Sequence, residues 1–191
     1  MTLNRAATES TRLRQATFAG GCFWCTEAVF KMLKGVTKVT PGYTGGTMEN
    51  PHYYTVSMGT TGHAEAIQIE FDPSKIAYPD LLHVFFATHD PTTLNQQGAD
   101  SGTQYRSAIF YHDEEQKKQA EKAIKLAQKD HPSKVVTEIT RFTTFYVAEN
   151  YHHDYYRKNS SAPYCRIVID PKIQKLKTKF SPYLKHSNPD H

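Results

Sequence analysis

The chain has 191 residues, a formal net charge of +4, and 38% hydrophobic residues. This length is sufficient for one domain with a substantial apolar core. The basic residues form no stripe interleaved with aromatic side chains, so the composition does not favour nucleic-acid binding. No apolar run is long enough to span a membrane.

The three cysteines form an odd set in a chain whose first residues, 1–14, are polar and lack the apolar segment of a secretory signal. This pattern favours a reducing compartment, with redox or catalytic cysteines rather than structural disulfides. We therefore expect a cytoplasmic monomer. Residues 1–14 are expected to form a loose leader, and residues 15–191 a single domain.

The most informative stretch surrounds Cys22. An extended segment at 15–19 is followed by Gly20-Gly21, and apolar residues then recur at helical spacing until about Gly35. Cys22 is thus predicted at a helix N-terminus, where the dipole favours a thiolate by roughly 0.3–1 kcal/mol. Lowering the pKa of a thiol by ~2 units requires about 2.7 kcal/mol, so further donors are needed. We interpret Cys22 as a nucleophile.

A second informative residue is Glu65. The segment 67–71 alternates apolar and polar residues, which predicts a strand with one buried face. Counting back along this strand, Glu65 has the register of the buried residues. A desolvated carboxyl has a raised pKa, and could serve as a general acid near neutral pH. The alternative is that Glu65 lies beyond the sheet edge, exposed or paired with an arginine.

The remaining pattern predicts an α+β fold, a two-layer α/β sandwich with a ferredoxin-like split βαβ core and extra helices. Strands are expected at 37–40, 105–111, 135–139 and 144–147, and loops at 41–46, 50–62 and 92–102. Helices are expected at 81–88, from Asp113 to about 129, and at 149–158. From about residue 159 we expect a long irregular C-terminal tail, with a short extended run at 166–169.

Several segments together resemble one known family, the class A peptide methionine sulfoxide reductases. The resemblance extends from about Phe18 to Cys165 and is specific, because its segments occur in the family's order. They are Gly21-Cys22-Phe23-Trp24 with Glu27, Pro41-Gly42-Tyr43-Thr44-Gly45-Gly46, Asn50-Pro51-His52-Tyr53, Thr61-Gly62-His63-Ala64-Glu65-Ala66, His89-Asp90-Pro91-Thr92, Asp100 to Ser107, and Ala148-Glu149-Asn150-Tyr151-His152.

The resemblance implies reduction of methionine S-sulfoxide in oxidised proteins, peptides or the free amino acid. Cys22 matches the family's nucleophile, and Glu65 matches the acid that protonates the sulfoxide oxygen. The other matching positions are implied to bind or order the substrate. They are Tyr53 and Tyr105, hydrogen-bonded to the oxygen, Asp100, which orders the site, and Phe23 and Trp24, which surround the S-methyl group.

The resemblance further implies that Cys22 becomes a sulfenic acid, which a second thiol converts to a disulfide that thioredoxin reduces. No bound cofactor is expected. Many family members have glycine at the position of Cys25, so this chain offers two resolving candidates. We favour Cys165, which matches the family's C-terminal recycling cysteine, as the first partner. Cys25 is the alternative, as direct or relay partner.

Two other functions are alternatives to a methionine sulfoxide reductase. A thioredoxin-like dithiol oxidoreductase would use Cys22 and Cys25 and would not depend on Glu65. A metal-binding or regulatory module is disfavoured, because adjacent histidines in His152-His153-Asp154 project to different sides of a helix. The lysine-rich run at 172–179 is interpreted as a solvated face. Both competing readings leave the segments around Glu65, Asp100 and Tyr105 unexplained.

Overall fold

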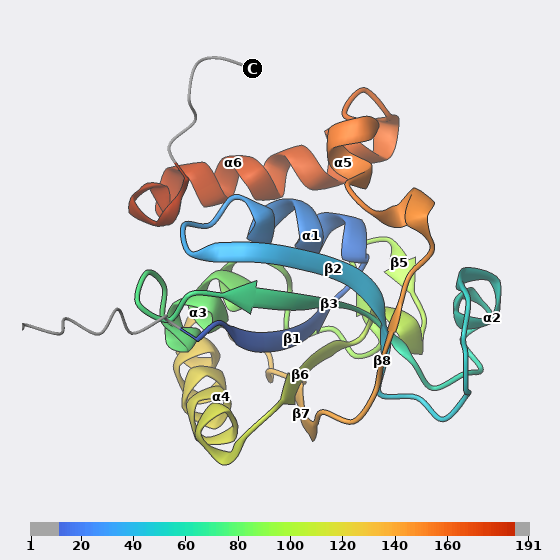
Figure 1. The fold of residues 1–191 in the computed structure, drawn as a ribbon, viewed down its shortest axis with the longest axis horizontal. Helices are drawn as coiled ribbons and strands as arrows, with labels where there is room; N and C mark the ends of the chain where they lie inside the picture. Colours follow the sequence, from blue (N-terminus) through green and yellow to red (C-terminus); the bar gives the residue numbers. More distant parts are fainter. Residues whose placement is uncertain (1–11, 186–191) are drawn as a thin grey trace, which may run out of the picture.

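The structure is a computed structural model that describes residues 12–185, so most of the expected leader lies outside the described residues. A six-stranded sheet in the order β7-β6-β1-β3-β2-β8 forms its centre (Figure 1). Its strands are β1 (Arg14–Gly20), β2 (Val36–Thr44), β3 (Ala64–Phe71), β6 (Ser107–Tyr111), β7 (Glu138–Arg141) and β8 (Phe145–Val147). The helices are α1 (Phe23–Lys31), α2 (Tyr53–Ser57), α3 (Tyr78–Thr88), α4 (Glu114–Ala127), α5 (Tyr155–Lys158) and α6 (Asp170–Lys179). Strands β4 (Gln96–Gln97) and β5 (Asp100–Ser101) form a separate two-stranded hairpin.

The ferredoxin-like core is confirmed. The unit β1-α1-β2-β3-α3-β6 gives four antiparallel strands in the order β6-β1-β3-β2, which is the split βαβ arrangement. After α4, strand β7 joins the sheet parallel to β6, and β8 joins the opposite edge antiparallel to β2. Within residues 12–185, no helix has the length and apolar character needed to cross a membrane.

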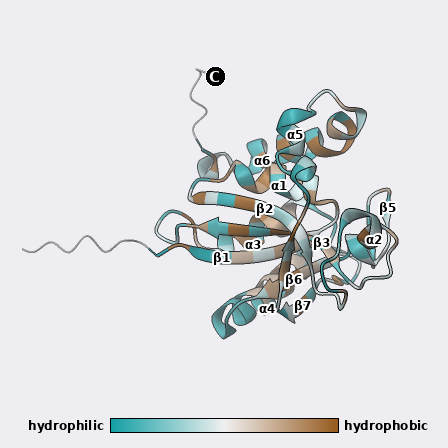
Figure 2. Ribbon diagram, turned by 45° about the vertical axis from the view of Figure 1, so that its right-hand side comes forward, coloured by the Kyte–Doolittle hydropathy of each residue, from teal (hydrophilic) through white to brown (hydrophobic). Residues whose placement is uncertain are grey.

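The main apolar core lies between the sheet and helices α1 and α3. Phe18 of β1 is fully buried at its centre, with its ring 5.7 Å from that of Phe30 on α1 and 5.0 Å from that of Phe85 on α3. Figure 2 shows the contrast between the apolar strands and the largely hydrophilic α4, which buries only three of its residues. Because α1 packs into this core, its first turn lies against the sheet.

Strand β2 is longer than the sequence predicted, because it includes residues 41–44, which were expected to form a loop. Gly42 explains the difference. A Cβ atom at this position would lie 2.3 Å from the carbonyl oxygen of Tyr146, so only glycine allows β8 to pair this closely with β2. The neighbouring segment at 50–62, expected to be irregular, contains α2.

The expected irregular C-terminal tail is wrong. Residues 165–169 form a π-helical turn, instead of an extended run, and lead directly into α6. Ile169, Ile173 and Leu176 recur at helical spacing and are buried, so α6 forms an outer layer against α1 and α3 (Figure 1). Pro171 is compatible with this helix because it occupies the first turn, where its missing N–H needs no partner.

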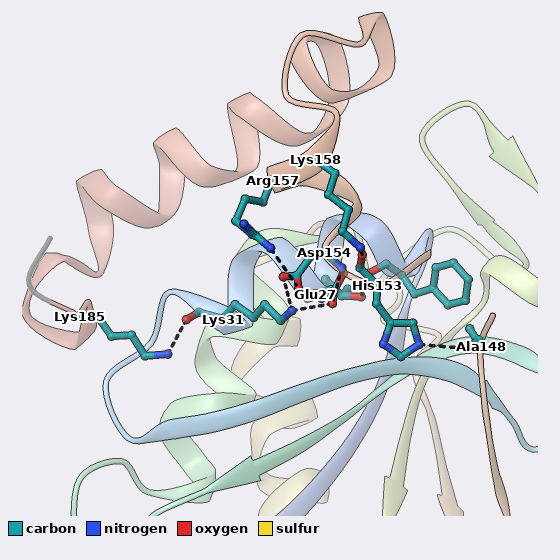
Figure 3. A network of polar contacts seen from close by, with 10 residues as sticks. Glu27, Lys31, Ala148, His153, Asp154, Arg157, Lys158 and Lys185 are labelled. Atoms are coloured by element: carbon teal, nitrogen blue, oxygen red, sulfur yellow. Dashed lines mark hydrogen bonds and ion pairs between the residues drawn. The ribbon is translucent and has the colours of Figure 1, made fainter. Parts of the chain in front are cut away.

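The predicted helix at 149–158 is interrupted. Asp154 has a φ of 56°, which separates a short 3₁₀ turn from α5. The backbone N–H of Asp154 donates to both carboxylate oxygens of Glu27 on α1, at 3.0 Å each, and Lys31 bridges the two acidic side chains (Figure 3). This network clamps the segment before α5 onto the helix that begins at Cys22.

Replacing Glu27 with glutamine is expected to destabilise the fold. The carboxylate is 2% exposed, and the substitution removes its charge and one acceptor, so a loss of about 1–3 kcal/mol is expected. Thermal unfolding should show this as a Tm decrease of roughly 2–10 °C. The matched control is Glu115→Gln on the exposed face of α4, which should change stability by less than about 0.5 kcal/mol. Equal Tm values for the two variants would contradict a stabilising role of the clamp.

Candidate active site

Cys22 occupies the N-cap position of α1, as the sequence predicted. Its carbonyl accepts from the backbone N–H of Cys25 at 3.1 Å, and its own backbone is not yet helical. Gly21, with a φ of 90°, makes the turn from β1, and a Cβ atom there would lie 2.5 Å from the Gln97 side chain. Glycine therefore lets the β4-β5 hairpin approach the half-buried Cys22 thiol.

The ionisation of Cys22 differs from the expectation for an isolated helix start. Burial raises the pKa of the Cys22 thiol well above its ordinary value, and a hydrogen bond with Cys25 and the charge of Glu65 act in the same direction. The resting group is therefore a thiol. The dipole of one helix is too weak to offset this desolvation.

Glu65 lies in β3 on the face that packs against α1, and the alternative of an exposed position is wrong. Its side chain is 2% exposed, and its Oε2 accepts from the backbone N–H of Phe23 at 3.0 Å. Burial raises the pKa of Glu65 to about 8, which outweighs that hydrogen bond. The carboxyl thus carries its proton at neutral pH, and its hydrogen-bond donor, Phe23, directly follows Cys22 in the chain.

A cavity of about 90 Å³ opens at these two groups. Eight residues line it: Cys22, Phe23, Trp24, Tyr53, Glu65, Asp100, Tyr105 and Tyr164. Seven of them are residues that the resemblance assigned to the site, so the structure brings together positions from β3, α1, α2, β5 and the turn before β6. Tyr164 was not predicted. A larger cavity of about 1270 Å³, between α3, α4 and α6, is lined by none of the three cysteines.

The polar side of the cavity carries two phenols. Burial raises the pKa values of both Tyr53 and Tyr105, so both remain proton donors at neutral pH. Tyr53 is held by its backbone N–H, which donates to Oε1 of Glu149 at 2.7 Å. The other oxygen of Glu149 accepts from the Tyr43 hydroxyl at 2.8 Å, which fixes the carboxylate.

The apolar side is an aromatic wall. Trp24 stacks on Tyr155 with ring centroids 3.6 Å apart and an interplanar angle of 4°. Its indole N–H donates to Nδ1 of the buried His152 at 2.9 Å, and the His152 ring packs against Tyr53 at 4.6 Å. His152 therefore supports the wall, a role that could be found only from the tertiary contacts.

The other two cysteines lie behind Cys22 rather than in the cavity lining. Cys25, in the first turn of α1, is 3% exposed and Cys165 is fully buried, and both belong to one apolar cluster with Ile169 and Ile173. A hydrogen bond from Cys22 lowers the pKa of Cys25, with a further contribution from the Lys172 charge. All three cysteines are free thiols that converge on one small region.

Within the part of the chain that the structure describes, no group of three or more His, Cys, Asp or Glu side chains could hold a metal ion. The chemistry available in the cavity is that of a thiol beside a neutral carboxyl, two phenol donors and an aromatic wall. Such a set suits reduction of a small polar group that carries an apolar substituent, because the oxygen of that group can receive protons.

Comparisons with known proteins agree with this geometry. The family model described as peptide methionine sulfoxide reductase matches residues 14–184. The peptide methionine sulfoxide reductase MsrA of Sulfolobus acidocaldarius is 59% identical over 165 residues, which cover 86% of this chain and 94% of the relative.

Solved structures agree too. The reduced form of Mxr1 from Saccharomyces cerevisiae superposes with a TM-score of 0.77 at 35% identity, covering 82% of this chain and 91% of that one. Mxr1 in complex with Trx2 gives a TM-score of 0.55 at 26% identity, covering 77% and 87%. On the family match, the sequence identity and the shared fold, this chain belongs to the peptide methionine sulfoxide reductase family.

Proposed function

We propose that this methionine sulfoxide reductase acts on the S epimer through Cys22 as nucleophile and Glu65 as general acid. The observation that carries the proposal is the neutral, buried Glu65 carboxyl in the same 90 Å³ cavity as the Cys22 thiol. The two phenol donors and the aromatic side chains that line the same cavity favour a sulfoxide over a protein disulfide as the substrate. The substrates are methionine sulfoxide residues in proteins and peptides, and the free amino acid.

The substrate's sulfoxide group fits the two sides of the cavity. Its S-methyl group would pack against Phe23 and Trp24, where burial of a methyl contributes roughly 0.8 kcal/mol. Its oxygen would then face Glu65 and the hydroxyls of Tyr53 and Tyr105. Asp100 lies at the same cavity and orders its polar rim.

The first step transfers the oxygen atom. The Cys22 sulfur attacks the sulfoxide sulfur while Glu65 gives its proton to the oxygen, and the thiol proton of Cys22 passes to the Glu65 carboxylate. The sulfur–oxygen bond to methionine breaks as the oxygen becomes bound to Cys22. Methionine leaves reduced by two electrons, Cys22 is oxidised to a sulfenic acid, and Glu65 is again neutral.

The second step forms a disulfide. The sequence favoured Cys165 as the first partner, but we now propose Cys25, because it is the cysteine that hydrogen-bonds Cys22 and its pKa is lowered. The non-helical backbone of Cys22 at the N-cap supports this pairing, since a rigid helical pair would be held less favourably. Cys165, in the same apolar cluster, is then positioned to receive the disulfide from Cys25 by thiol exchange.

Thioredoxin is the proposed final reductant, as suggested by the similarity to Mxr1 in complex with Trx2. Three free cysteines with redox roles suit a reducing compartment, and we propose that the protein works as a monomer in the cytoplasm. No bound cofactor is required, because each electron pair passes through a thiol.

A single-turnover reaction with each epimer tests the proposal. Reduced, desalted protein mixed with the S epimer, without reductant, should form at least one methionine per chain while free thiols disappear. The R epimer should give none, since each epimer has its own reductase. A matched sample of Cys22→Ser controls for contaminating activity. Unchanged thiols and no methionine from either epimer, in a folded sample, would overturn the assignment.

A further inference from the structure

Tyr164 connects two parts of the site that the proposed mechanism treats separately. Its hydroxyl donates to Oδ2 of Asp100 at 2.8 Å and lies 3.7 Å from Sγ of Cys25. The ring meets Trp24 edge-on, with centroids 5.8 Å apart at 82°, and it also lines the substrate cavity. The C-terminal segment thus places one phenol between an α1 thiol and the carboxylate of β5.

The direction of these hydrogen bonds follows from the number of protons. A phenol has one hydroxyl proton, and in Tyr164 it is given to Asp100. The contact with Cys25 must therefore use the phenol oxygen as acceptor and the Cys25 thiol as donor. The groups form a continuous chain from the Cys25 thiol through the Tyr164 hydroxyl to the Asp100 carboxylate.

We propose that Tyr164 is a catalytic residue of the resolving step, which passes the thiol proton of Cys25 to Asp100 when Cys25 attacks the sulfenic acid of Cys22. The proposal deepens, and rests on, the proposed roles of Cys22 and Cys25. Asp100 becomes the proton acceptor of the resolving step, acting through Tyr164.

The resolving step balances with the groups present. The Cys25 proton moves to the Tyr164 oxygen while the Tyr164 hydroxyl proton moves to Asp100. The electron pair on Cys25 sulfur forms the bond to Cys22 sulfur, and the sulfur–oxygen bond of the sulfenic acid breaks. The departing hydroxide takes the proton of neutral Glu65 and leaves as water. The proton on Asp100 is afterwards returned to Glu65 through solvent.

The surroundings of Cys25 suit a transient thiolate. The charged or titratable groups around it are Cys22 on the same helix, Lys172 on α6, Asp100 on β5, Glu65 on β3, and Tyr164 and Cys165 on the segment before α6. Lys172 is fixed by donation from its Nζ to the carbonyl oxygen of Thr88 at 2.8 Å. Its positive charge favours the ionised form of Cys25, and the Asp100 charge opposes it.

The test uses Tyr164→Phe, which removes the hydroxyl and keeps the ring. The matched control is Tyr156→Phe in the same segment, whose hydroxyl donates to Asp170 at 2.6 Å instead. Both are made in a Cys165→Ser background, so that only the Cys22–Cys25 disulfide can form. Intact-mass measurement of quenched samples separates the sulfenic acid, which gains an oxygen, from the disulfide, which loses two hydrogens.

In Tyr164→Phe, the ratio of the resolution rate to the methionine-formation rate is expected to fall at least about tenfold at pH 7. This deficit should shrink as the pH rises, because Cys25 then ionises without the relay. Tyr156→Phe should keep the parent ratio and pH profile. An unchanged ratio and profile in Tyr164→Phe would overturn the relay.

A second comparison separates the relay from a packing effect. Asp100→Asn should lower the same ratio, and the double variant with Tyr164→Phe should lower it no further, because both changes interrupt one chain. Additive losses would contradict the proposal. Failure of the proposed function would look different, as the parent would then form no methionine or its sulfenic acid would persist without Cys165.

Discussion

Replacing Glu65 with glutamine is expected to slow methionine formation by about 10²–10⁴-fold, the usual contribution of a positioned general acid. Glutamine keeps the size of the side chain and still accepts from the backbone N–H of Phe23, so the cavity should remain intact. It has no proton that it can give to the sulfoxide oxygen. Rapid-quench measurement of methionine in a single turnover isolates this step from disulfide recycling.

The pH dependence provides an independent check on the same carboxyl. Because the pKa of Glu65 is raised to about 8, the wild-type rate should be flat below that pH and fall as the proton is lost above it. Glu65→Gln should lack this fall. The control is Glu70→Gln, on the opposite face of β3, which should behave as wild type. A wild-type rate that rises through pH 8 would exclude Glu65 as the acid.

Replacing Cys25 with serine is expected to reduce thioredoxin-supported turnover by at least about 100-fold while leaving one methionine per chain in a single turnover. The Cys22 sulfenic acid would lack its neighbouring thiol and should accumulate. Trapping with a sulfenic-acid reagent, followed by mass measurement, detects it. Rapid formation of a Cys22–Cys165 disulfide in this variant would show that Cys165 is the first partner.

The number of methionines formed without reductant tests the transfer of the disulfide from Cys25 to Cys165. Transfer of the disulfide to Cys165 frees Cys22 for another turnover, so the wild-type chain should form about two methionines. The Cys165→Ser variant should form one methionine per chain. It should also lose steady-state turnover if thioredoxin reduces the Cys25–Cys165 disulfide. Formation of only one methionine per wild-type chain would contradict this disulfide transfer.

The central part of this site could be predicted because its signals are local. Glu65 follows from alternation within one strand, and Cys22 from a glycine turn before a helical repeat. The family segments then supplied Tyr53, Tyr105 and Asp100, and all of them line the cavity. For Glu65, two independent arguments agree: the alternation of residues along its strand and the match to the family's acid.

Other features depend on contacts that the sequence does not reveal. Tyr164 meets Asp100 across 64 positions of the chain, and its neighbours in sequence look like an ordinary turn. The raised pKa of Cys22 depends on how deeply α1 packs, which a helix-start pattern does not report. Helix α6 could have been found from the helical spacing of Ile169, Ile173 and Leu176, but its lysine-rich run at 172–179 was interpreted only as a solvated face.

The layering of the three thiols has a consequence for how the protein meets oxidants. Cys22 is half-buried and faces the cavity, whereas Cys25 is 3% exposed and Cys165 is fully covered by the C-terminal segment and α6. Peroxide that enters from solvent reaches Cys22 first, and a sulfenic acid formed there can be resolved by Cys25. The two interior thiols remain shielded from direct over-oxidation until Cys22 has reacted. The outer layer of the fold thus acts as a barrier that preserves the reducing capacity of the enzyme between catalytic cycles.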